Sequence, residues 1–220
     1  MRGLQELSEQ AQDSQYLYVY GIAPLKDKMR FGFAGLKKKP LAIVQHADIA
    51  AVVSSYPVLN PLVNEDDAMQ HAEVLKRLAN KTAVIPMAFG AVFKDEATLK
   101  TVLEKTYAAL KECLELIGGK IELGVKVVRK DLSSDYDGKV AEIISSLKSL
   151  CVKDSKADNF SDRLLLNYSF LVERTKFSKF SNEVAKLEKR HKELKFIYTG
   201  PWPPYSFVNI SIRGENVHNR

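Results

Sequence analysis

Cysteine is scarce in this 220-residue chain, and it contains no long apolar run. The two cysteines, Cys113 and Cys151, form no C-x-x-C pair, so we expect no disulfide framework and a reducing compartment. No stretch approaches the roughly 18 consecutive apolar residues that a membrane-spanning helix needs. The N-terminal stretch carries acidic side chains and no apolar core of signal-peptide length. These absences predict a soluble, cytoplasmic protein with no membrane partner.

Recognisable catalytic and metal-binding motifs are missing as well. The chain has no H-E-x-x-H, no G-x-S-x-G, no Walker A loop and no G-x-G-x-x-G. The four histidines share no metal-ligand spacing, and His71 and His191 lie on or beside predicted helix stripes, where we expect hydrogen-bonded structural histidines. We therefore expect no enzyme, no cofactor, no metal and no small-molecule substrate.

The excess of positive charge is small. The chain has 33 Lys and Arg against 27 Asp and Glu, a net charge of +6. Spread over a whole chain, such an excess is typical of solubility and does not indicate a nucleic-acid partner. One predicted helix has a Lys-rich side that we interpret as solvated surface. That side carries Lys179, Lys186, Lys189 and Lys192.

The apolar pattern predicts a mixed α+β fold. In the first half we expect strands at 16–22, 41–45 and 49–54, a bent strand within 82–93, and helices that begin after Asn64 and Asp95. In the second half we expect strands at 121–128, 164–172, 196–198 and 207–212, and helices at 139–150 and 177–194. A small antiparallel sheet with helices on one face would bury the second set.

We expect the chain to divide into two domains near Gly118-Gly119, because this pair ends a predicted helix and precedes a predicted strand. The expected organisation is a flexible leader at 1–15, an N-terminal α+β domain at 16–118, a second domain at 119–212 and a polar tail at 213–220.

The most informative segment is TGPWPPY at 199–205. Its three prolines remove backbone donors and restrict φ, so it cannot join a central strand and should form a stiff, extended connection after Tyr198. Its candidate functional residues are Trp202, Pro203, Pro204 and Tyr205. They either clamp the two halves together or present aromatic rings to a protein partner.

Several segments, in this order along the chain, resemble the gas vesicle accessory proteins F and L. They are YLYVYGI at 16–22, VIPMAFGAVF at 84–93, GKIELGVKV at 119–127, NYSFLV at 167–172 and TGPWPPYSFV at 199–208. The resemblance covers nearly all of the chain from Tyr16 to Ile212, and its last segment is the most specific. The chain departs from the family's P-M-R-F-G pattern at Ala88, where the family usually has arginine.

This resemblance implies a two-domain α+β protein whose second domain is a modified ferredoxin-like antiparallel sheet with helices on one face. It implies an accessory protein for gas vesicle formation, located in the cytoplasm and associated with gas vesicles. Such a protein would bind the small hydrophobic shell subunit and other accessory proteins, as an assembly or nucleation factor or a minor component. The family is associated with no catalysis and no cofactor.

Two other classes of function stay open. A ferredoxin-like RNA-binding module would stack bases on an open sheet face, and Tyr16, Tyr18 and Tyr20 alternate onto one face of a strand. The chain lacks an RNP-like K/R-G-F/Y-G/A-F sequence, which argues against this module. A small-molecule enzyme on a ferredoxin-like scaffold would be supported only by analogy of fold.

Overall fold

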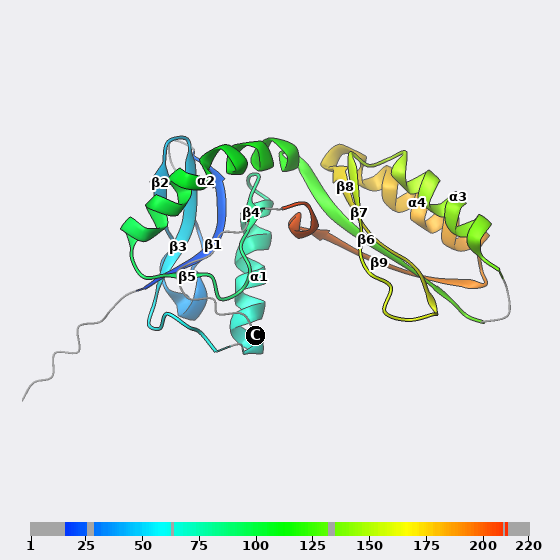
Figure 1. Cartoon of the computed structure of the whole chain (residues 1–220), viewed down its shortest axis with the longest axis horizontal. Helices are drawn as coiled ribbons and strands as arrows, with labels where there is room; N and C mark the ends of the chain where they lie inside the picture. The colour runs from blue at the N-terminus through cyan, green and yellow to red at the C-terminus, as the bar shows by residue number, and fades with distance from the viewer. Residues whose placement is uncertain (1–15, 26–28, 63, 132–134, 209, 211–220) are drawn as a thin grey trace, which may run out of the picture.

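The structure, a computed structural model, describes residues 16–25, 29–62, 64–131, 135–208 and 210. It contains two antiparallel sheets, each covered by its own helices (Figure 1). The expected α+β fold is therefore confirmed. The expected leader at 1–15 and tail at 213–220 lie outside the described residues.

The first sheet is built around strand β1 (Tyr16–Pro24). On one side β1 pairs with β3 (Ile49–Tyr56), which pairs in turn with β2 (Ala42–His46). On the other side β1 pairs with two short strands, β4 (Ile85–Pro86) and β5 (Val92–Phe93). The bent strand expected within 82–93 is thus two short strands with a loop between them.

Two helices cover opposite faces of the first sheet. Helix α1 (Glu65–Ala79) packs on one face and α2 (Glu96–Ile117) on the other. Both begin at the expected caps, Asn64 and Asp95, whose side chains accept backbone N–H bonds from the first turn. A short 3-10 turn, η1 (Leu36–Lys38), lies beside α1.

The second sheet has the strand order β7-β8-β6-β9. Strands β6 (Lys120–Arg129) and β8 (Leu164–Glu173) form its centre, and β7 (Lys153–Lys156) and β9 (Leu194–Trp202) form its edges. All three pairings are antiparallel. We did not expect β7, because its sequence KDSK has no apolar alternation.

Helices α3 (Asp137–Lys148) and α4 (Phe177–Arg190) lie side by side on one face of the second sheet (Figure 1). A 3-10 turn, η2 (Arg174–Lys176), leads into α4. The second half therefore runs strand, helix, strand, strand, helix, strand, which is the ferredoxin-like order. The ferredoxin-like expectation is confirmed.

The prediction of a strand at 207–212 is wrong for the residues of this range that the structure describes. Tyr205–Phe207 form a 3-10 turn, η3, and Val208 and Ile210 belong to no strand. The remaining residues, 209, 211 and 212, lie outside the described part. A buried carboxylate holds this turn against the second sheet, as the next subsection shows.

Between the end of α2 and the start of β6 lie Gly118 and Gly119, where we expect the two domains to meet. Among the described residues the two sheets share no strand. The chain nevertheless returns to the first half, because Val208 and Ile210 pack against its core. Arg174 also donates a hydrogen bond to the Ala79 carbonyl at the end of α1. The division into folding units at 118 and 119 therefore stays a prediction.

A buried histidine links the layers of the first half. His71 of α1 is 4% exposed; its Nδ1 lies 2.9 Å from Tyr18 Oη and its Nε2 lies 3.0 Å from the Met87 carbonyl oxygen. Because a carbonyl only accepts, Nε2 carries the proton and Nδ1 accepts from the Tyr18 hydroxyl. The Gly90 N–H donates to that hydroxyl at 3.1 Å. His71 is the hydrogen-bonded structural histidine that we expected.

We predict that acid weakens this link. Burial lowers the pKa of His71, against a smaller opposing effect of its bond to Met87. A lowered folded-state pKa means that the stabilisation is fully present above the unfolded value of about 6.5 and is lost as the pH falls further. Urea unfolding at about pH 7.5 and 5.5 measures this loss. Glutamine in His71→Gln keeps a hydrogen-bond donor and an acceptor but does not titrate. The unfolding free energy of this variant should therefore fall less between the two pH values than that of the wild type. An equal loss would contradict the prediction.

Candidate functional site

The candidate site is the end of β9 and the turn that follows it. We expected the strand to end at Tyr198. This prediction is wrong, because β9 continues through Pro201 and Trp202. Proline is tolerated here because β9 is an edge strand, and the expectation that the segment joins no central strand is confirmed. Gly200 has a φ of +110°, and a Cβ there would lie 2.8 Å from the Glu122 carbonyl oxygen, so this close approach needs glycine.

The side chain of Glu122 fastens the turn to the second sheet. It is 6% exposed and lies on the sheet face opposite α3 and α4. Its Oε2 accepts the Ser206 N–H at 2.8 Å, and its Oε1 accepts the hydroxyls of Ser206 at 2.6 Å and Ser169 at 2.7 Å. Such charge-assisted bonds offset the cost of burying a carboxylate. Sequence reasoning missed Glu122, because its main partner lies 84 residues further along the chain.

The turn separates the four candidate residues into two pairs. Pro203 and Pro204 are buried, whereas Trp202 and Tyr205 are 52% and 43% exposed. Although Tyr205 is partly exposed, desolvation of its hydroxyl and the charge of Glu122 raise its pKa to about 12, so it stays protonated at neutral pH. The segment thus packs through its prolines and presents its aromatic rings.

The aromatic face on which the RNA-binding alternative depended is not open. Tyr18 and Tyr20 are fully buried beneath α1, and Tyr16 is half-buried. The Tyr20 ring stacks on His71 with centroids 5.7 Å apart, and its hydroxyl accepts the Leu36 N–H. The open aromatic face that the RNA-binding alternative requires is therefore absent from this strand, because helix α1 covers Tyr18 and Tyr20.

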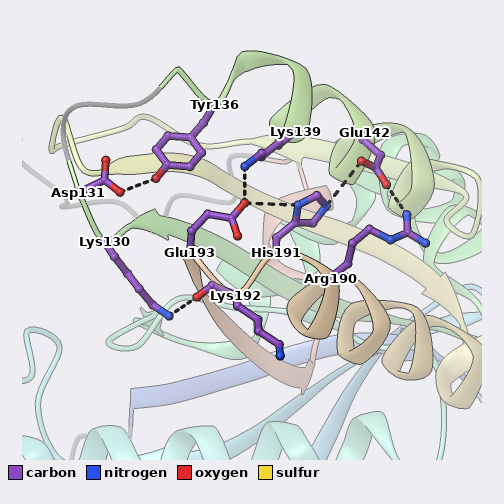
Figure 2. Close-up of polar contacts among 9 residues, drawn as sticks. All are labelled: Lys130, Asp131, Tyr136, Lys139, Glu142, Arg190, His191, Lys192 and Glu193. Carbon is purple, nitrogen blue, oxygen red and sulfur yellow. Dashed lines mark hydrogen bonds and ion pairs between the residues drawn. The ribbon is translucent and has the colours of Figure 1, made fainter.

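A second group of charged side chains lies where α3 meets the turn between α4 and β9 (Figure 2). Glu142 pairs with Arg190, and Lys139 Nζ lies 2.5 Å from Glu193 Oε1. Buried His191 lies between the two carboxylates, with Nε2 3.6 Å from Glu142 and Nδ1 3.8 Å from Glu193. These ion pairs fasten α3 to the end of α4. Unlike our expectation of a hydrogen-bonded ring, His191 Nε2 has no hydrogen bond within the described part of the chain.

Neither group resembles a metal centre. Among the residues described, no three or more His, Cys, Asp or Glu side chains are arranged to hold a metal ion. Across the same residues, no helix combines the length and apolar character that a membrane crossing requires.

Fold and sequence together define the class of protein. A family model described as gas vesicle synthesis protein GvpL/GvpF matches residues 16–137 and 128–209. The chain therefore belongs to this gas vesicle accessory family, and the resemblance found in the sequence is confirmed.

Named relatives support this assignment. Gas vesicle protein F2 of Halobacterium salinarum is 34% identical over 208 residues, which cover 92% of this chain and 96% of the relative. Gas vesicle protein F of Haloferax mediterranei is 34% identical over 214 residues, covering 94% and 100%. The crystal structure of GvpF from Anabaena sp. PCC7120 is 23% identical and superposes with a TM-score of 0.77, covering 93% of this chain and 100% of that chain.

The departure from the family pattern at Ala88 lies on the surface. Ala88 is exposed in the loop between β4 and β5, while its neighbour Met87 is buried. An arginine at this position would therefore reach solvent.

We predict that the Glu122 carboxylate holds Trp202 in place. Trp202 is the only tryptophan, so the intrinsic tryptophan fluorescence reports on this segment alone. Glu122→Ala removes the three hydrogen bonds that the carboxylate accepts, which should lower the unfolding free energy by about 2–3 kcal/mol. It should also increase acrylamide quenching of Trp202. Glu112→Ala, an exposed carboxylate on α2, is the matched control and should change neither. Unchanged quenching in Glu122→Ala would contradict this role.

Proposed function

We propose that this chain is a non-catalytic accessory protein that binds the small hydrophobic shell subunit of gas vesicles and other accessory proteins. It acts in the cytoplasm, associated with gas vesicles, as an assembly or nucleation factor or as a minor component. A shell with a dry inner face needs very hydrophobic subunits, and their apolar surface must be covered until they polymerise. A binding partner with exposed apolar side chains can cover it. No nucleic acid, membrane or small-molecule substrate is part of this proposal.

The observation that carries the proposal is a pair of exposed aromatic rings on a fixed backbone. Trp202 and Tyr205 flank two buried prolines, and the Glu122 carboxylate fastens the turn. Tryptophan and tyrosine give large contact areas at interfaces with little loss of side-chain entropy. Because the backbone beneath them is already ordered, binding costs less conformational entropy here than at a mobile loop.

The edge of β9 adds a second means of contact. Ile197 on the same strand is 38% exposed, so β9 presents a further apolar side chain besides Trp202. An edge strand also carries backbone groups that can pair with a strand of another protein. A strand of the shell subunit could therefore bind β9 through its backbone and the aromatic rings through its side chains.

We predict that Trp202→Ala separates binding from stability. Because this side chain is half-exposed, its removal should change the unfolding free energy by less than about 1 kcal/mol. Capture of the purified shell subunit should fall about tenfold or more if the ring is a central contact. Met69→Ala, which removes an exposed apolar side chain from α1 in the first half, should leave capture unchanged. A stability loss of about 3 kcal/mol or more would identify Trp202 as a clamp. If the Trp202→Ala variant has the stability of the wild type and captures the shell subunit equally well, Trp202 is neither a partner contact nor a clamp.

We also predict that capture of the shell subunit depends little on salt. Burial of apolar surface is not screened by ions and is strengthened by some salts. A complex that neutralised about six phosphates would instead weaken about a thousandfold between about 50 and 200 mM salt. Titration of both complexes with purified protein measures the difference. We expect no RNA or DNA binding tighter than about 10⁻⁵ M near physiological salt. Tight, steeply salt-dependent nucleic-acid binding without capture of the subunit would overturn the proposal.

A further inference from the structure

Most of the chain's charge excess lies in one short stretch. Residues 174–195 hold eight basic and three acidic side chains, a net charge of +5 out of +6 for the whole chain. This stretch comprises α4, its flanking turns and the first two residues of β9. The remaining 198 residues are nearly neutral, so the expectation of an excess spread over the whole chain is wrong. A charge concentrated in one segment creates a local positive potential that the same charge spread over the whole chain does not.

The apolar side chains of α4 pack on the second sheet, whereas its lysines are exposed. The outward side contains a shallow hollow of about 550 Å³. It is lined by Lys179, Asn182, Glu183, Ala185, Lys186 and Lys189. At 1.5 Å of rise per residue, its three lysines extend along about 15 Å of the helix.

The positive charge of this hollow is only partly neutralised. Glu183 accepts the Ser146 hydroxyl at 2.7 Å, and this bond lowers the pKa of the carboxyl group. Glu183 also lies 3.5 Å from Lys186, whose side chain is 71% exposed. Within the described part of the chain, Lys179 and Lys189 have no carboxylate partner. Two free ammonium groups and one loosely paired one therefore face solvent across a concave surface.

We propose that the outer side of α4 binds an acidic protein segment whose carboxylates lie opposite Lys179, Lys186 and Lys189. A hollow that follows one helix fits a second helix or an extended chain laid along it. No aromatic side chain lines the hollow for base stacking, so an acidic protein segment fits it better than single-stranded RNA. The site lies on the opposite face of the second sheet from Trp202, so both surfaces can be occupied at once.

The test uses the full chain and no gas vesicle component, so its outcome is separate from that of the proposed function. The probe is a labelled, alanine-rich helical peptide whose glutamates repeat the seven- and three-residue spacings of the three lysines. Fluorescence anisotropy should show binding that weakens as salt screens the charges. Replacing Lys179, Lys186 and Lys189 together with glutamine should weaken binding by about tenfold or more. Glutamine keeps the helix propensity of lysine, and circular dichroism checks the fold.

The matched control replaces three exposed lysines of the first half, Lys94, Lys100 and Lys105, with glutamine, which changes the net charge equally. This control should bind the peptide as the wild type does, and the glutamine version of the peptide should not bind. The proposal is overturned if the two triple variants bind equally or if the wild type does not bind the acidic peptide. Tighter binding of a single-stranded RNA of equal charge would also overturn it, in favour of a nucleic-acid site.

Discussion

The buried carboxylate of Glu122 is the constraint on which the geometry of the C-terminal segment depends. A carboxylate can be buried in a folded protein only where its oxygens receive hydrogen bonds, and Ser206 supplies two of the three that it accepts. This requirement folds the chain after β9 back onto the sheet as a 3-10 turn. As a consequence Trp202 and Tyr205 remain exposed, and Val208 reaches the core of the first half. One buried acid thus fixes the turn that presents the aromatic rings and precedes the contact of Val208 with the first half.

The second sheet therefore has two different faces. One face is covered by α3 and α4. The lysines lie on the exposed side of α4, and the charged cluster around His191 lies where α3 meets the turn before β9 (Figure 2). The other face carries Glu122 and the turn η3. Association through the aromatic surface depends on apolar burial and is insensitive to salt, whereas association through the lysines is screened by it. A protein with one apolar and one basic surface could bind an apolar partner and an acidic partner at the same time, without competition between them.

The features that depend on neighbouring residues could be predicted from the sequence. Helix α2 is an example, because its cap at Asp95 and its end at Gly118 are local signals. Features that depend on distant residues could not be predicted. The pattern of Tyr18 and Tyr20 does not reveal that α1 covers them, and nothing near Ser206 indicates a carboxylate 84 residues earlier. Strand β7 was missed for another reason, since a short polar edge strand is defined by its partner and has no periodicity of its own.

The central claim is that the aromatic rings held by Glu122 contact the shell subunit. Because Trp202 is the only tryptophan, protein labelled with 5-fluorotryptophan should give a single fluorine resonance. The purified shell subunit is added in steps, while sedimentation measures complex formation independently. The account predicts that this resonance shifts or broadens in proportion to the amount of complex, because burial at an interface changes the surroundings of the ring. A complex that forms while the resonance of Trp202 stays unchanged would contradict the account.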